Sequence, residues 1–368
     1  MAGEGTGGFS LAMLRQLSED HRTTNIFFSP FSISSALAMV MLGARGDTAT
    51  QMAEVQLTYS KIHSLFQQLL EELNKPRAGF LLSVANRLYG EQSFLFLQEF
   101  LKQTSSCYKA ELESVDFKNK YEEARIKINR KIKDVLSEAD LKAATNLVLV
   151  NAIYFKGTWN RPFMNSKTRD ARFKLTMIRS KSVKMMKQKS VFRLGFVQKI
   201  LEMPYIENEL SMLIFLPKQE GLKKLERVLT CERFMEWTHP DQMPLTYVKV
   251  KVPRFKLEET YNLSNVLTSM GVKDAFNQMT CDFSGETHGT LPDLFLSEAT
   301  HKAFVEVNEE GTEAAAATAS FMCGKSLCMC CHRVPTFTAN RPFLFFFRHN
   351  SSMTLLFAGR FFSPGLQL

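Results

Sequence analysis

Four cysteines and a histidine crowd together near residue 330, and side chains of these types could hold a soft metal ion. They are Cys323, Cys328, Cys330, Cys331 and His332. The thiolate and imidazole ligands of structural zinc sites come in pairs at regular spacings. These five side chains match no such spacing and stand on a single stretch of chain. We therefore predict no metal and no cofactor, and we expect scattered thiols that are sensitive to oxidation.

Other patterns that support catalysis do not occur in the sequence. There is no Gly-x-Ser-x-Gly or His-Glu-x-x-His motif, and the seven histidines lie far apart in the chain. Gly324-Lys325-Ser326 resembles the end of a phosphate-binding loop, but Ala319 occupies the position of its required first glycine. Residues of a catalytic triad meet only in space, and no pattern here indicates one. We predict that the protein is not an enzyme.

The cysteines belong to a long segment that has little to bury. Before it, Ala303, Val305 and Val307 alternate with other residues, as in a half-buried strand. Residues 312–320 carry no bulky apolar side chain, and residues 334–337 are strand-like again. A loop of this length in a compact domain is either functional or disordered, and its alanines and threonines differ from a linker composition. The segment is either a mobile surface loop or one that can change into an inserted strand.

Residues 304–319, with the sequence FVEVNEEGTEAAAATA, resemble the hinge of the reactive-centre loop of inhibitory serpins, in the intracellular ovalbumin-type branch (clade B). Stretches that resemble the same family, in the same order, cover essentially the whole chain: residues 25–54, 147–159, 201–217, 252–261 and 340–364. The resemblance implies an α+β serpin fold with three β-sheets, about nine helices and an exposed reactive-centre loop at about residues 309–335. We predict one domain, residues 1–368.

The resemblance implies that the protein is a suicide substrate for a serine protease, with a cysteine protease as a cross-class alternative. The protease would attack one loop bond and form an acyl-enzyme. The cut loop would then insert into the central sheet and carry the covalently bound protease with it. Small side chains enter a closing sheet without steric penalty, and Glu313 should point outward by strand alternation. The hinge residues are Glu309, Glu310, Gly311, Thr312, Glu313, Ala314, Ala315, Ala316 and Ala317.

Two positions compete for the reactive bond. The family keeps a fixed count from the hinge, which places the bond at Lys325-Ser326 and implies a trypsin-like protease. Counting back from the end of the loop gives Met329-Cys330, and Cys328-Met329 resembles a bond that suits chymotrypsin- or elastase-like proteases. We prefer Lys325-Ser326, because the hinge count fixes how far the tethered protease travels.

The resemblance also implies a hydrogen-bonded cluster where the sheet must open, and a tryptophan where insertion begins. Buried polar groups need partners, so a cluster that can exchange partners is plausible there. Ordinary roles compete with these, since Ser29 before Pro30 is a good helix cap and the others suit a satisfied core. The cluster is Ser29, Ser32, Asn151 and His301, and the tryptophan is Trp159.

The chain departs from the family pattern in three places that are short: around residues 55–62, 128–132 and 192–200. The shortening near Arg130 removes a helix end that packs on the central sheet and moves during insertion. A non-inhibitory serpin with a binding or structural role is therefore the alternative function. The hinge favours the inhibitor, and the shortening near Arg130 favours the alternative.

Composition limits the environment and the partners. The chain is 45% hydrophobic without an apolar run long enough to span a membrane, and its N-terminus has no secretory pattern. Seven cysteines fit a reducing compartment, so we predict a cytoplasmic monomer. The net charge of +9, concentrated in residues 118–133 and 179–189, could attract nucleic acid or another polyanion. Solvated faces are favoured instead, because no aromatic residues interleave with these lysines and arginines.

The elements that position these residues follow from apolar spacing. Helical spacing predicts helices over residues 9–17, 33–42, 60–74, 97–108 and 121–136. Alternating or continuous apolar runs predict strands over residues 25–28, 78–90, 147–155, 210–216, 248–252, 343–347 and 354–361. Helices dominate the first third of the chain and strands the rest, which indicates an α+β fold with large sheets.

Overall fold

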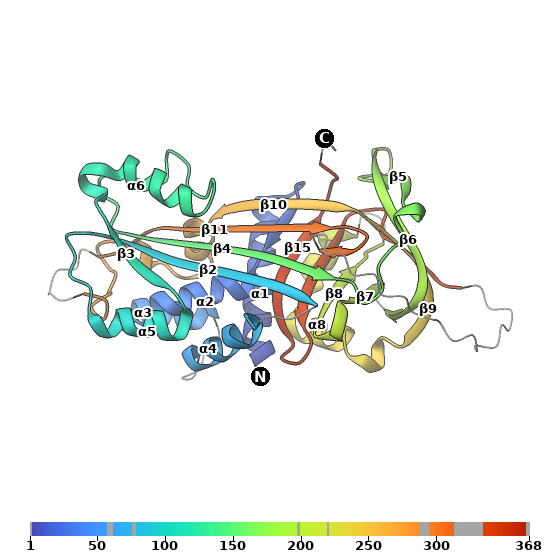
Figure 1. Ribbon diagram of the computed structural model, residues 1–368, viewed down its shortest axis with the longest axis horizontal. Helices are drawn as coiled ribbons and strands as arrows, with labels where there is room; N and C mark the ends of the chain where they lie inside the picture. Colours follow the sequence, from blue (N-terminus) through green and yellow to red (C-terminus); the bar gives the residue numbers. More distant parts are fainter. Residues whose placement is uncertain are drawn as a thin grey trace.

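The computed structural model describes residues 2–56, 62–75, 79–196, 199–218, 221–287, 294–312 and 334–365. These residues form two extended β-sheets, with helices packed around them (Figure 1). The prediction of an α+β fold is confirmed. None of the helices in this part of the chain is long and apolar enough to cross a membrane.

The central sheet has six strands, and four of them run side by side along the molecule (Figure 1). Its order is β10 (Phe255–Asn262), β11 (Leu296–Val307), β12 (Gly311–Thr312), β4 (Leu147–Thr158), β2 (Phe80–Glu91) and β3 (Glu111–Val115). Strand β4 is buried along most of its length, because its continuous apolar run packs on both faces.

The second sheet has nine strands. It contains β1 (Ile26–Phe28), β15 (Thr354–Phe361), β14 (Phe343–His349), β8 (Leu210–Phe215), β7 (Ile200–Pro204), β6 (Ser180–Gly195), β9 (Leu245–Pro253) and β13 (Thr336–Thr338), with β5 (Arg169–Lys174) on β6. Only three residue pairs between β6 and β7 join its two halves. Hydrogen bonds between β6 and β7 therefore join two of the three expected sheets into this single nine-stranded sheet.

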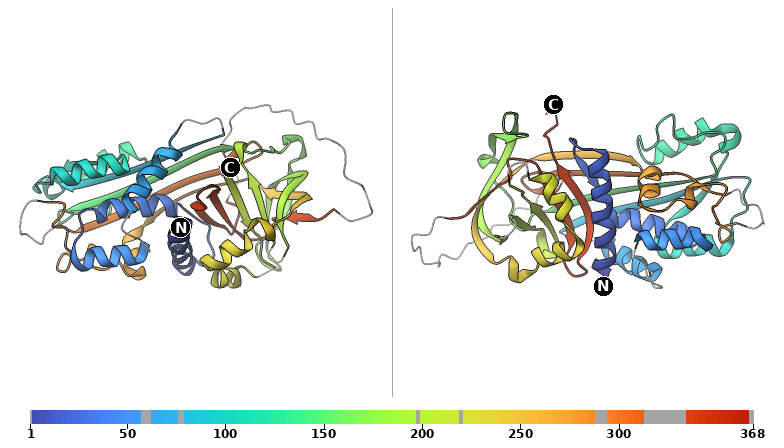
Figure 2. Two further views of the ribbon diagram at one scale, coloured as in Figure 1. Left: turned by 90° about the horizontal axis from the view of Figure 1, so that it is seen from below. Right: turned by 180° about the vertical axis from the view of Figure 1, so that it is seen from behind.

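Nine α-helices occur in the described residues. They are α1 (Ala2–Asp20), α2 (Pro30–Met41), α3 (Gly46–Gln56), α4 (Ile62–Leu73), α5 (Gln98–Tyr108), α6 (Phe117–Lys131), α7 (Leu222–Val228), α8 (Cys231–Trp237) and α9 (Leu263–Met270). Helix α6 lies on one face of the central sheet, and α2 lies against the other (Figure 2). Helix α2 is buried along almost its whole length, as its apolar sequence predicts.

Helix α6 differs from its prediction over residues 121–136. It starts earlier because Asp116 caps it and accepts a hydrogen bond from the Asn119 N–H at 2.9 Å. It ends at Lys131, and the non-helical residues Val135 and Leu136 are nevertheless buried, in one cluster with Val148 and Val150 of β4. The shortened segment near Arg130 therefore still covers the central sheet.

Candidate functional site

The chain folds back on itself after β11 and enters the central sheet. Strands β11 and β4 pair directly and in parallel as far as Phe304 and Tyr154. Beyond that point β12 lies between them: Thr312 pairs with Val307 of β11 and with Gly157 of β4, both antiparallel. The sheet is therefore already parted at this end, and the first hinge residues occupy the gap.

A tight turn makes this reversal possible. The side-chain Oδ1 of Asn308 accepts hydrogen bonds from the backbone N–H groups of Glu310 and Gly311, both at 3.1 Å. Gly311 has φ +156°, and a Cβ atom there would lie 1.9 Å from the carbonyl oxygen of Gly157. Only glycine fits at this position, since any side chain would collide with the backbone of β4.

Trp159 holds the turn in place. Its indole N–H donates to the Asn308 carbonyl at 3.0 Å, and its backbone N–H donates to the Glu310 carbonyl at 2.9 Å. Its ring stacks on Tyr205 with the ring centroids 4.4 Å apart. The Tyr205 hydroxyl in turn hydrogen-bonds the Thr312 hydroxyl at 2.6 Å. Burial raises the pKa of Tyr205, while its bond to Thr312 acts in the opposite direction.

The expectation of an exposed loop starting at residue 309 is wrong for its first residues. Glu309 is only 5% exposed and Thr312 is fully buried. The Glu309 carboxylate accepts a hydrogen bond from the Thr168 hydroxyl at 2.7 Å, and its carbonyl accepts one from the Phe163 N–H at 2.7 Å. Because these polar groups find partners, residues 309–312 pack into the body of the protein, where sequence reasoning placed them in an exposed loop.

The remainder of the loop lies outside the described residues. This applies to Glu313, Ala314, Ala315, Ala316, Ala317, Lys325, Ser326, Cys328, Met329 and Cys330. Within the described part of the chain, no group of three or more histidine, cysteine or acidic side chains could hold a metal ion.

A second group of polar residues lies midway along the central sheet. His301 of β11 and Asn151 of β4 are directly paired in the sheet register, and His301 Nδ1 hydrogen-bonds Asn151 Oδ1. The Asn151 amide donates to Ser32 Oγ at 2.6 Å. Ser29 caps α2 through the Ser32 N–H and donates its hydroxyl to the Leu356 carbonyl at 2.6 Å. The structure thus brings together all four residues expected beneath the sheet.

Sequence reasoning missed two members of this cluster. The Asn151 amide also donates to Asn86 Oδ1 on β2, and the Asn86 amide donates to Ser35 Oγ at 3.0 Å. The sequence did contain a signal for Asn86, because it lies inside the predicted strand over residues 78–90 and a buried amide needs hydrogen-bond partners. The cluster therefore links α2 to three strands of the central sheet.

The hydrogen bonds assign the proton of His301. Its Nε2 accepts from the Ser29 N–H at 3.0 Å, so in the neutral ring the proton is on Nδ1 and is donated to Asn151. Complete burial lowers the pKa of His301 from 6.5 to about 3. A charged imidazole could not accept the Ser29 bond, so the cluster requires neutral histidine.

Acid is expected to destabilise the protein through His301. The folded-state pKa is depressed, so the stability from this residue is present above pH 6.5 and is lost as the pH falls toward 3. By pH 5 the loss should be about 2 kcal/mol, at about 1.4 kcal/mol per pH unit. The measurement is the thermal stability of the wild type and of His301→Gln at pH 7.5 and at pH 5.0. The glutamine amide can accept from the Ser29 N–H and donate to Asn151, but it does not titrate. Equal pH dependence in the two proteins would contradict it.

The chain resembles known proteins in both sequence and structure. The family model described as serpin (serine protease inhibitor) matches residues 4–364. The chain belongs to the serpin family. It is 48% identical to human leukocyte elastase inhibitor and 45% to human Serpin B9, with 97% and 98% of each chain covered. Among solved structures, uncleaved ovalbumin matches with a TM-score of 0.90 at 34% identity, covering 99% of this chain and 100% of ovalbumin. A tumour suppressing serpin matches at 0.88 and 32%, covering 99% of both chains.

Proposed function

We propose that the protein inhibits a trypsin-like serine protease as a suicide substrate, with Lys325-Ser326 as the bait bond. One observation carries the proposal: the chain entering the loop already lies between β11 and β4, the strands that insertion must separate. The relatives named as elastase inhibitors support protease inhibition, whereas the trypsin-like target rests on the lysine at position 325. A cysteine protease remains the cross-class alternative target.

The proposed reaction begins as ordinary proteolysis. The serine oxygen of the protease attacks the carbonyl carbon of Lys325 and gives up its proton to the protease histidine. The bond to Ser326 breaks, its nitrogen leaves as an amine with that proton, and an ester joins Lys325 to the protease. The basic side chain of Lys325 would occupy an acidic specificity pocket, as trypsin-like enzymes provide.

Insertion then competes with hydrolysis of this ester. The hinge would extend from Thr312 between the strands, replacing the direct β11–β4 pairs from Phe304 back toward Leu296. It would also break the bond between His301 and Asn151, which crosses the same strand pair. The gap at Thr312 means that insertion starts by lengthening an existing strand and needs no new nucleus.

Incubation with trypsin and, separately, with chymotrypsin or elastase tests this function. We expect an SDS-stable band at the summed mass with trypsin, and intact-mass analysis of the released peptide should place the cut after Lys325. Lys325→Ala should abolish the trypsin complex, whereas Met329→Ala should leave it unchanged. A cut after Cys328 or Met329 would show that the reactive bond is one of the two alternatives, and the target would then be a chymotrypsin- or elastase-like protease. Clean cleavage without any complex would leave the non-inhibitory alternative, in which the fold serves binding.

The cellular compartment and the oligomeric state are part of the proposed function. We infer a monomer acting in the cytoplasm, supported by an odd number of cysteines, which does not suit a framework of paired disulfides. The non-inhibitory alternative rested on the shortening near Arg130, and the packing of Val135 and Leu136 on the sheet weakens it.

A second candidate function, binding of single-stranded nucleic acid, is favoured by the outer face of β6 and β9. Lys187 lies directly opposite Lys251, and Lys189 opposite Lys249, so two like-charged pairs stand side by side. Such pairs destabilise a sheet, and no carboxylate of the described residues pairs with these lysines. Tyr247 is 46% exposed on the same face, two residues before Lys249. It supplies the aromatic platform that the sequence alone did not place beside the lysines.

Titration of labelled oligo(dT) at increasing salt tests the second function. Lys187→Gln with Lys251→Gln should lower the slope of log affinity against log salt by about 1.4, the value for two lost phosphate contacts. The matched pair Lys118→Gln with Lys120→Gln, on α6, should leave the slope unchanged. Tyr247→Ala should weaken binding at least several-fold through lost stacking. If the α6 pair lowers the slope as much, the proposed face is wrong.

A further inference from the structure

A hollow lies at one edge of the nine-stranded sheet, away from the hinge. It is bounded by the turn after β5, the start of β14, the end of β15 and helix α7. Strand β15 runs beside α1 in the view from behind (Figure 2). Arg22, in the turn that follows α1, lines one side of the hollow. None of the described hinge residues and no member of the central cluster lines this pocket.

The charge around this pocket is strongly one-sided. Among the residues that the structure describes, six cations line it against a single carboxylate, Glu226. Arg360 Nη1 forms an ion pair with Glu226 Oε1 at 2.9 Å, and the Ser18 hydroxyl donates a hydrogen bond to the same oxygen at 3.2 Å. No carboxylate among the described residues pairs with the other five cations. These five are Arg22, Lys174, Lys218, Lys223 and Arg341.

Arg341 shows that the positive charge is partly withdrawn from water. Its Nε donates to the Pro217 carbonyl at 2.7 Å, which fixes the guanidinium at the wall of the pocket. Burial lowers the pKa of Arg341 and thereby disfavours its charged form. An anion in the pocket would offset this cost, because opposite charges attract more strongly at a desolvated site.

The walls between the cations are apolar. They are formed by Leu175, Pro217, Leu222, Pro342 and Phe362. The cavity volume is about 150 Å³. An apolar cavity of roughly that size holds a benzene molecule in another protein, so the hollow has room for one aromatic ring. Binding pockets for small ligands combine such walls with a few placed polar groups.

We propose that this pocket binds a small aromatic anion, in which a single ring carries a phosphate, sulfate or carboxylate group. The ring would lie against Phe362 and Pro342, and the acidic group would face Lys218, Lys223 and Arg341. A bound anion would stabilise the folded protein in proportion to its occupancy. The site is independent of protease inhibition, since none of its lining residues belongs to the hinge or the central cluster.

Calorimetric titration with phenyl phosphate tests the proposal, with inorganic phosphate and benzyl alcohol as the two half-ligands. We expect phenyl phosphate to bind more tightly than either half. Lys218→Glu with Lys223→Glu should weaken it about 10-fold, the effect of losing and reversing two partly exposed charges. Phe362→Ala should reduce its affinity to that of inorganic phosphate.

The matched control is Lys102→Glu with Lys142→Glu, which makes the same charge change at exposed positions outside the pocket. It should leave the affinity for phenyl phosphate within about twofold, since distant exposed charges are screened by salt. Equal weakening in both double variants would show that only net charge matters, and it would overturn the site. Equal affinity for phenyl phosphate and inorganic phosphate would overturn the aromatic part of the proposal. Benzoate and phenyl sulfate then decide which acidic group the site prefers.

Discussion

Thr312→Arg is expected to turn the protein from an inhibitor into a substrate. Thr312 is fully buried between β11 and β4, where its hydroxyl bonds Tyr205. An arginine in this gap would have to bury an unpaired charge, at a cost of several kcal/mol. The variant should therefore keep residue 312 outside the sheet before cleavage, so that insertion afterwards has to bury the charge. A cost of about 3 kcal/mol at that step slows insertion roughly 100-fold, so hydrolysis of the ester is faster. Densitometry of SDS-stable complex against cleaved protein measures this partition.

Two variants at the hinge serve as controls for this result. Thr312→Ser keeps the hydroxyl that bonds Tyr205 and should retain complex formation. Glu310→Arg introduces the same arginine at a partly exposed position outside the gap, and it should form complex close to the wild-type level. If Thr312→Arg forms as much complex as Thr312→Ser, the hinge does not insert along the gap between β11 and β4.

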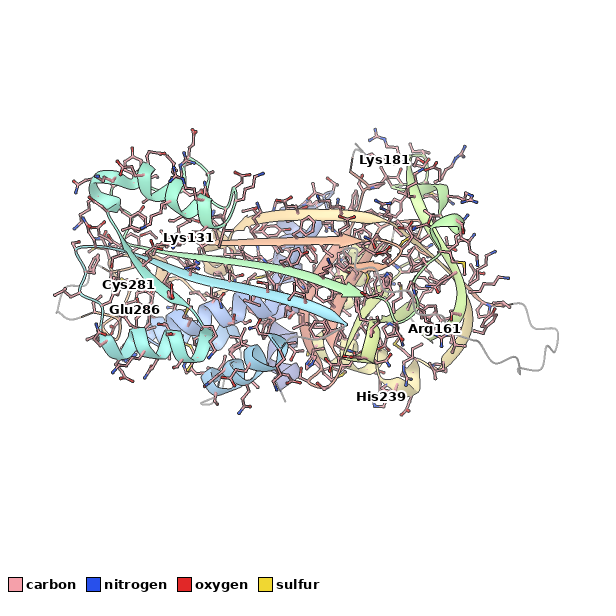
Figure 3. The ribbon with its side chains drawn as sticks, in the orientation of Figure 1. Lys131, Arg161, Lys181, His239, Cys281 and Glu286 are labelled. Atoms are coloured by element: carbon pink, nitrogen blue, oxygen red, sulfur yellow. The ribbon has the colours of Figure 1, made fainter. Side chains whose placement is uncertain are left out.

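The second large effect concerns Glu286, a carboxylic acid in the core. Its side chain is completely buried, and neither carboxylate oxygen has a hydrogen-bond partner among the described residues. A Cβ atom built on Gly43 would lie only 1.9 Å from Glu286 Cγ, so the Glu286 side chain packs directly against this glycine. Figure 3 shows Glu286 at the end of the molecule opposite Arg161. Burial raises its pKa well above 4.5, while the charge of Arg45 acts in the opposite direction.

Glu286→Met is expected to stabilise the protein by about 2–4 kcal/mol at pH 7.4, because a buried unpaired acid gives way to an apolar chain of similar length. The gain should depend on pH. The folded-state pKa is raised, so wild-type stability is highest below 4.5 and declines as the pH rises through the folded value. The difference between variant and wild type should therefore grow with pH. Denaturant unfolding between pH 4.5 and 8 measures it.

Glu286→Gln separates the two contributions in this prediction. It removes the titration but leaves a buried amide without partners, so its stability difference from wild type should grow with pH as that of the methionine variant does, while at every pH it gains less stability than methionine. Both variants should form the trypsin complex at the wild-type level, since Glu286 is remote from the hinge. A stability gain that is the same at pH 4.5 and pH 8 would contradict ionisation as the cause.

The local features of this fold could be predicted from the sequence because they depend on neighbouring residues. Ser29 before Pro30 signalled the start of α2, and the structure shows Ser29 as its cap. The apolar run of β4 signalled a strand buried on both faces. The start of α6 was predicted wrongly because the aspartate cap at Asp116 was not taken into account.

The sequence by itself determined the family, since the resemblance lies in continuous stretches such as residues 304–319, and it predicts the hinge in the same stretch. Only the tertiary structure decided that Thr312 is already buried in the sheet against Tyr205, a residue 107 positions away. The partners of His301, and the lack of a hydrogen-bond partner for the Glu286 carboxyl group among the described residues, were likewise decided by packing. The physical reason is that hydrogen bonding and desolvation act between groups that meet only after the chain folds, whereas capping and periodicity act between neighbours along it.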